Sequence, residues 1–419
     1  MKEQPVTIST MAVYAVALMV LVAAAATTTR PFLRLLRLPS VAAYVGAGWV
    51  WMLFGLGIGP HGLNALDNQV VDALRPLILV AIGWVGLTVG VQLTWHTLRR
   101  IPWVAWRWAG LDMLACTAVA ALLLLGSGPS WMKVDDLSGA WVLMPVVIVG
   151  VSLMGWNPET RSMLLHAAPS ERGAARVATG TAGLSTVMAV LLLGVASQFV
   201  VRDMEGVPAL NAPLAAAGLA AAVGLAACAA LAIRVLLSKG EWSMNRTLVV
   251  VTSVAALSAG IATELTFSPL LSALLCGAAM ANLPGTLRVS VGRLLGRSER
   301  AVATLFFVLA GALLNPPGAL WPWVLVAGCC AARLALKPWV ASVAARPVLH
   351  AAGRNRTLLR AATSRQSALA VVVAVAAVLS EDSLIRREIL FVVVATGVVS
   401  AAPPLLARMR AARRAGASA

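Results

Sequence analysis

The chain has little charge for its length. Only 12% of its 419 residues are Asp, Glu, Lys or Arg, whereas a soluble domain carries about 25%. Hydrophobic residues make up 60%, and apolar runs long enough to cross a bilayer recur from end to end. In lipid a backbone must satisfy its own hydrogen bonds, so runs of this length predict helices. The composition excludes an ordinary soluble protein and predicts an all-α polytopic membrane protein.

Acidic residues are scarcer than basic ones. There are 16 Asp and Glu against 33 Lys and Arg, which gives a formal net charge of +17. Such an excess can indicate a nucleic-acid partner. Here the Arg residues lie mostly in short loops between apolar runs, as in Arg99–Arg100 and the linker Arg288–Arg300. This is the positive-inside pattern of membrane proteins, so we expect no nucleic acid as a partner.

Cysteine and histidine are too scattered to predict a metal site or a disulfide framework. The five cysteines lie in apolar segments without a CxxC spacing, which is typical of thiols that only fill space. They are Cys116, Cys228, Cys276, Cys329 and Cys330. The four histidines stand apart from one another near helix ends. We therefore expect no metal, no cofactor and no enzyme activity.

The apolar runs predict about thirteen spans, the first at Thr7–Ala26. Basic residues follow that span, which is the reverse of a cleaved signal peptide and places the N-terminus outside. Because successive spans alternate in direction and their number is odd, we expect the C-terminus in the cytoplasm. We expect the protein in the inner cell membrane. We expect residues 1–406 to form one transmembrane transporter domain, and 407–419 to form a basic cytoplasmic tail. The other spans are expected at 40–59, 74–93, 103–125, 140–165, 177–200, 212–237, 247–262, 268–283, 301–314, 320–345, 358–379 and 389–406.

One of these spans, 320–345, carries Arg333 and Lys337 well inside it. A cation at mid-bilayer depth costs at least about 2.5 kcal/mol on insertion scales, so it usually faces a polar cavity or a partner. Because the two residues are four positions apart, they lie on one face of the helix. Pro338 removes one backbone donor directly after the lysine. The sequence thus predicts a polar centre toward which both cations point.

Two spans are interrupted by polar residues near mid-depth. The span 140–165 contains SLMGWNPETR at Ser152–Arg161, and the span 358–379 contains TSRQS at Thr363–Ser367. A single break of this kind is readily explained as a proline kink whose backbone is satisfied locally by Ser and Thr. Secondary transporters, however, place paired broken helices at the substrate site, in matching positions of two inverted repeats. Two breaks seven spans apart, with Lys337 between them, favour a transporter.

In their order and spacing, these segments resemble the bacterial cation/proton antiporters of the sodium/proton exchanger superfamily, especially the potassium-efflux and Nap-type branch. The resemblance covers nearly the whole chain. It implies crossed broken helices in two inverted repeats, a core domain that moves against a scaffold domain by alternating access, exchange of a monovalent cation for protons, and a homodimer. The matching segments are Leu38–Leu63, the stretch AIGWVGLTVGVQL that ends at Leu93, Ala262–Asn282, Leu305–Asn315 and Thr363–Val373.

The chain departs from this family at its charged centre. The family's mid-membrane Asp falls on Ser185, and the acid of its second break falls on Ser367. Lys337 and Arg365 match the family's basic residues, and Asn157 lies where relatives carry a polar residue before the crossover proline. The residues expected to line the ion and proton pathway are Asp112, Asn157, Glu159, Thr181, Ser185, Lys337, Arg365 and Ser367.

Three residues can take over from the missing carboxylate. Glu159 can stand near Lys337 and carry the ion, or it can pair with Arg161 at a solvated helix restart. Asp112 can serve instead, although a structural role as the partner of a cation such as Arg107 is the favoured interpretation. Lys337 can itself carry the proton, because burial disfavours a charged amine. Its alternative role is to neutralise helix ends at the crossover.

Three functions remain open. The first is antiport of Na⁺ or K⁺ against protons with an atypical ion site. The second is an anion or small-acid carrier on the same fold, because Arg333, Lys337 and Arg365 with few acids make a positive centre. The third is a non-transporting relative with a sensory role. Proton-coupled cation flux, anion counterflow, or the absence of both distinguishes the three.

Overall fold

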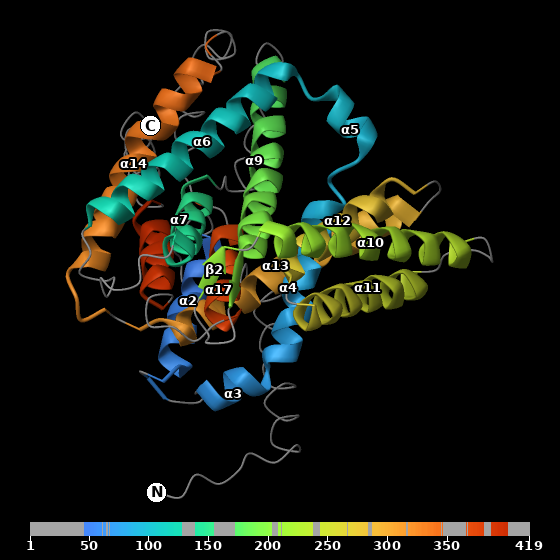
Figure 1. Cartoon of the computed structure of the whole chain (residues 1–419), viewed down its shortest axis with the longest axis horizontal. Helices are drawn as coiled ribbons and strands as arrows, with labels where there is room; N and C mark the ends of the chain where they lie inside the picture. The colour runs from blue at the N-terminus through green and yellow to red at the C-terminus, as the bar shows by residue number, and fades with distance from the viewer. Residues whose placement is uncertain are drawn as a thin grey trace, which may run out of the picture.

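The structure of the chain is a computed structural model. It describes residues 46–60, 62–63, 66, 68–127, 139–154, 172–202, 208–210, 212–237, 244–265, 267–283, 287–315, 317–344, 346, 366, 368–380 and 387–400. The described residues are almost entirely helical, which confirms the all-α prediction (Figure 1). A small antiparallel pair, β1 (Val200–Arg202) with β2 (Pro208–Leu210), is the exception.

The helices follow the apolar runs of the sequence. They are α2 (Gly46–Ile58), α3 (Asn68–Ala73), α4 (Arg75–Gly90), α5 (Trp95–Arg100), α6 (Trp103–Gly126), α7 (Gly139–Met154), α9 (Arg172–Phe199), α10 (Ala212–Leu237), α11 (Met244–Glu264), α12 (Pro269–Ala281), α13 (Leu287–Leu313), α14 (Trp321–Ala344), α17 (Ala368–Ser380) and a last helix at 387–400.

Within the described residues, five helices are long and apolar enough to cross a membrane. They lie in α6, α9, α10, α11 and α14, and shorter apolar helices include α4, α12 and α17. The chain is thus a multi-pass membrane protein. The number of thirteen spans stays a prediction, and the first predicted span, Thr7–Ala26, lies outside the described residues.

The basic stretch at 288–300, expected as a linker, is instead the first half of α13 and continues without a break into the next span. The stretch contains no proline. Its apolar residues Val291, Leu294 and Leu295 recur at helical spacing and are buried against neighbouring helices. A linker is expected from the sequence because a basic run between apolar segments has the composition of a loop. The many Arg residues make the helical spacing of the apolar residues difficult to recognise.

The helices pack in two groups. In one group, α6 packs against α7, α9 and α14; in the other, α4 packs against α11, α12 and α13, while α10 packs against α12 and α2 against α13. Figure 1 shows α6 and α14 on one side of the molecule and α10 and α11 extending away on the other. The short helix α5 lies between α4 and α6 in the chain, so it links the two groups.

Glycine lets α4 and α12 approach closely. A Cβ added at Gly277 of α12 would lie 2.6 Å from the carbonyl oxygen of Leu87, and one added at Gly90 of α4 would collide with the carbonyl oxygen of Leu274. In a membrane, where there is little hydrophobic drive between helices, such small-residue contacts are a main source of packing energy. This interface therefore joins α4 and α12 closely within the second group.

Candidate functional site

Two cations of α14 meet the C-terminal end of α7. Arg333 and Lys337 are buried, with 1% and 2% of their surface exposed. The Nη1 atom of Arg333 donates to the carbonyl oxygens of Ser152, at 2.5 Å, and Leu153, at 2.9 Å. The Nζ atom of Lys337 donates to the carbonyl oxygen of Met154 at 2.9 Å. The last carbonyls of a helix have no partner within it and carry partial negative charge, so a buried helix end requires donors of this kind.

The same lysine forms a buried ion pair with Asp112 of α6. Its Nζ atom lies 2.7 Å from Oδ1 and 2.6 Å from Oδ2 of the carboxylate. Asp112 is fully buried, and one turn further along α6 the thiol of Cys116 donates to Oδ1 at 3.6 Å. A charge in such surroundings is tolerated only when it is paired, because desolvation of an unpaired ion costs several kcal/mol.

Asp112 has a cation as its partner, as the favoured interpretation expects, but this cation is Lys337 and not Arg107. Arg107 is exposed and donates instead to the carbonyl oxygen of Val343 at 2.8 Å. The crossing of α6 and α14 brings Asp112 and Lys337 together although 225 positions separate them in the chain. The centre therefore does contain a carboxylate, which comes from α6 and not from the helix that carries Ser185.

Thr181 and Ser185 are both fully buried in α9. The hydroxyl of Thr181 donates to the carbonyl oxygen of Val177 at 2.9 Å, so it is satisfied within its own helix. The hydroxyl of Ser185 has no hydrogen-bond partner among the residues that the structure describes. Ser185, at the position where the family carries an Asp, is therefore a buried polar residue without charge.

Four predicted pathway residues, Asn157, Glu159, Arg365 and Ser367, lie outside the described residues, and their roles stay predictions. The described helix that precedes the first predicted break contacts the described helix that follows the second. α7 has its last described turn at Met154, α17 begins at Ala368, and the two helices are in contact.

Gln366 is a residue of this centre that the sequence analysis did not single out. Its Nε2 atom donates to the hydroxyl of Ser152 at 3.1 Å and to the carbonyl oxygen of Val393 at 3.1 Å. It thus joins the segment before α17, the end of α7 and the helix at 387–400. The sequence signal for Gln366 is its position within the polar interruption TSRQS, beside Arg365 and Ser367.

The described centre is less positive than the sequence indicates. Two cations face one carboxylate and a helix end that carries about half a negative charge. Each cation donates hydrogen bonds to an oxygen of α7, and Lys337 also binds Asp112. Little of this positive charge is left for an outside anion.

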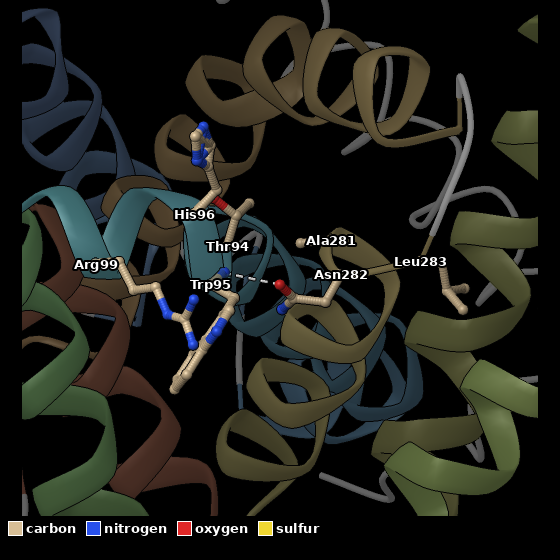
Figure 2. A pocket seen from close by; sticks show the side chains of 7 residues that line it. All are labelled: Thr94, Trp95, His96, Arg99, Ala281, Asn282 and Leu283. Atoms are coloured by element: carbon tan, nitrogen blue, oxygen red, sulfur yellow. Dashed lines mark hydrogen bonds between the residues drawn. The ribbon is translucent and has the colours of Figure 1, made fainter.

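A hollow of about 460 Å³ lies apart from this centre, between the turn that follows α4 and the end of α12 (Figure 2). Within it Asn282 accepts a hydrogen bond from the backbone N–H of Trp95 at 2.7 Å and donates to the carbonyl oxygen of Leu93 at 3.0 Å. Arg99 stacks on the Trp95 ring, 4.8 Å from its centroid. These contacts anchor the link between the two helix groups. The hollow is lined by Thr94, Trp95, His96, Arg99, Ala281, Asn282 and Leu283.

Comparison with known proteins agrees with this architecture. The family model described as "Sodium/hydrogen exchanger, transmembrane" matches residues 10–408. Among solved structures, the sodium proton antiporter MjNhaP1 from Methanocaldococcus jannaschii at pH 8 has a similar fold, with a TM-score of 0.60 and 11% sequence identity over 94% of this chain and 97% of that chain. At this identity the likeness concerns the fold alone. No curated protein matches the chain.

Proposed function

Because the chain belongs to the sodium/hydrogen exchanger family, we propose that it exchanges Na⁺ or K⁺ for protons and that Asp112 and Lys337 form the exchange site. As a member of this family it is a secondary transporter of the cation/proton antiport class and not an enzyme. The observation that supports the site is the buried ion pair at the end of α7.

In this proposal the cation and the proton compete for one carboxylate. The protonated amine of Lys337 occupies both oxygens of Asp112, which is the only buried carboxylate among the described residues. When Lys337 releases its proton, the two oxygens become free to bind a monovalent cation. When Lys337 takes up a proton again, its ammonium group displaces that cation. One proton is thus exchanged for one cation at this pair.

Arg333 has a different part in this proposal. A guanidinium stays protonated in proteins, so Arg333 cannot take part in proton exchange. It holds the carbonyls of Ser152 and Leu153 while the neighbouring lysine changes its state. The end of α7 therefore keeps one permanent cation through the whole cycle.

The anion-carrier alternative has less support, because two of the three cations on which it depends, Arg333 and Lys337, already bind α7 and Asp112. Glu159 stays a second candidate for the carrier carboxylate. We further infer, from the family resemblance and the distribution of basic residues, a homodimer in the inner cell membrane with the N-terminus outside and the C-terminus inside.

The test is the collapse of a pH gradient in proteoliposomes on addition of Na⁺ or K⁺. We expect cation-dependent proton movement with the wild type and none with Asp112→Asn or Lys337→Met. Removal of one partner of a buried ion pair destabilises a protein by about 3–5 kcal/mol. The double variant Asp112→Asn/Lys337→Met, which leaves no unpaired charge, should therefore be folded and inactive, as judged by its melting temperature in detergent.

Glu159→Gln is the matched carboxylate control. Activity that survives in Glu159→Gln and disappears in Asp112→Asn supports the proposed site, whereas the opposite result moves the carrier to Glu159. If neither cation moves protons with the wild type, antiport is wrong. Counterflow of an anion would then support the carrier alternative, and no flux at all, with changes at Lys337 tolerated, would support a sensory role.

A further inference from the structure

A buried carbonyl oxygen without a partner belongs to the same centre. The side chain of Gln366 is almost fully buried, with 7% of the residue exposed, and its Oε1 atom has no hydrogen-bond partner in the described part of the chain. The identity of this atom follows from chemistry. The carbonyl oxygen of Val393 can only accept, so the amide atom that contacts it is the nitrogen, and the free atom is the oxygen.

The side chain of Gln366 is tied to the last described turn of α7, the same turn that binds Lys337. The amide nitrogen of Gln366 donates to the hydroxyl of Ser152, and two residues later Met154 accepts from Lys337, the partner of Asp112. One helical turn rises about 5.4 Å, so Ser152 and Met154 lie within a single turn. Gln366 and the ion pair thus reach the same end of the same helix.

The chemistry of the free atom selects its ligand. An amide oxygen is a neutral acceptor, so it attracts a cation or a hydrogen-bond donor and repels an anion. Buried polar atoms without partners are rare in folded proteins and each requires an explanation. Here the two hydrogen bonds of Nε2 fix the direction of Oε1, and an oxygen held in place is suited to distinguish ions of different size.

We propose that Oε1 of Gln366 is a ligand of the transported monovalent cation and contributes to the choice between Na⁺ and K⁺. This inference rests on the function proposed above. Asp112 supplies the charge that any monovalent cation requires, and it does little to distinguish one from another. The number and field strength of neutral oxygens is one of the properties on which Na⁺ and K⁺ selection depends. Gln366 supplies such an oxygen without a proton that could compete with the cation.

The experiment measures the concentration of Na⁺ and of K⁺ at which pH-gradient collapse reaches half its maximal rate. Gln366→Met has a similar length and lacks the oxygen. We expect it to keep coupled proton movement at high cation concentration, to raise the half-saturating concentration of the preferred cation at least about tenfold, and to change the Na⁺/K⁺ ratio. Ser272→Ala is the control. It removes another buried hydroxyl without a partner among the described residues, and it lies in α12, which packs against α4, α10 and α11.

A second pair of variants separates ligation from a structural role. Ser152→Ala removes one of the two hydrogen bonds of Nε2 but keeps Oε1, so its Na⁺/K⁺ ratio should change less than that of Gln366→Met. Gln366→Glu keeps an oxygen at the site and adds charge, so cations should raise its melting temperature in detergent more than that of the wild type. This readout needs no transport and applies even where Gln366→Met does not fold.

The inference is wrong if folded Gln366→Met keeps the wild-type ratio, or if Ser152→Ala changes the ratio as much as Gln366→Met does. In either case coupled transport by the wild type would still stand, and with it the proposed function. Absence of coupled movement in the wild type would instead overturn the proposed function and this inference together.

Discussion

At the scale of single residues, Arg333 and Lys337 share one helix face and yet suit different tasks. Arg333 presents a rigid planar group that stays charged and binds two successive carbonyl oxygens of α7. Lys337 presents a single nitrogen that contacts both α7 and Asp112. Arg333 is therefore suited to hold the helix end, whereas Lys337 is the residue to which we assign proton exchange in the proposed function.

Arg333→Leu should lower the stability of the protein. It leaves the carbonyls of Ser152 and Leu153 buried without this donor, at a penalty of about 1–3 kcal/mol for each buried group. Arg333→Lys should recover part of the loss, because it restores a charged donor without the planar geometry. Thermal unfolding in detergent measures both. The neighbouring Leu334, 53% exposed on the same helix, provides the control: Leu334→Ala should change the melting temperature little, and an equal loss at both positions would contradict the prediction.

The ion pair should show strong coupling in a double-mutant cycle. Asp112→Asn and Lys337→Met each leave one buried charge unpaired, so each should destabilise the protein by about 3–5 kcal/mol. The double variant should lose much less than the sum of the two, because contacting residues are not additive. Denaturation of the purified variants in detergent gives the three values. Additive losses would mean that the two side chains do not depend on one another.

At the scale of helices, the contact of α4 with α12 depends on the absence of side chains. Gly277→Ala should destabilise the protein, because its new Cβ would lie 2.6 Å from the carbonyl oxygen of Leu87. Gly260→Ala on α11 is the matched control, since nothing lies within 4 Å of the position of its Cβ. There alanine should be neutral, or stabilising by up to about 1 kcal/mol through its higher helix propensity. Melting temperatures that fall equally in both variants would exclude close packing as the cause.

The link between the two helix groups depends on Asn282. Asn282→Ala removes its hydrogen bonds to the backbone of Leu93 and Trp95. We expect faster hydrogen exchange of the amide of Trp95, which would lose its acceptor, with little change inside α6. Gln92→Ala is the control, because Gln92, just after α4, is exposed and bonds only weakly, at 3.4 Å, to the carbonyl oxygen of Thr88. Unchanged exchange at Trp95 would show that this turn is held by other contacts.

At the scale of the whole molecule, the basic residues predict the orientation in the membrane. A fused reporter that is active only in the cytoplasm should be active after Ala419, and inactive when fused to the N-terminus ahead of Met1. The physical reason is that short loops rich in Lys and Arg stay on the cytoplasmic side. Activity at both ends would require an even number of spans and would overturn the predicted count of thirteen.

The sequence by itself determined the helical and membrane-embedded character of the protein. The length and composition of an apolar run are local properties of the sequence. In lipid, a run of this length satisfies its backbone hydrogen bonds by forming a helix. The spacing of Arg333 and Lys337 likewise placed both cations on one face, because the helical period is a local constant. The polar interruptions of two spans located the centre to within a few residues, and α7 and α17 have their described ends beside them.

Only the tertiary structure decided which groups those cations meet. The pairing of Lys337 with Asp112, the capping of α7 by α14, and the bridge from Gln366 to Ser152 join residues 180 or more positions apart. Such contacts depend on where two helices cross and on which turn of each faces the other, and no spacing along the chain encodes that. The sequence therefore showed that a charged centre exists, while the crossing of α6, α7 and α14 supplied its carboxylate.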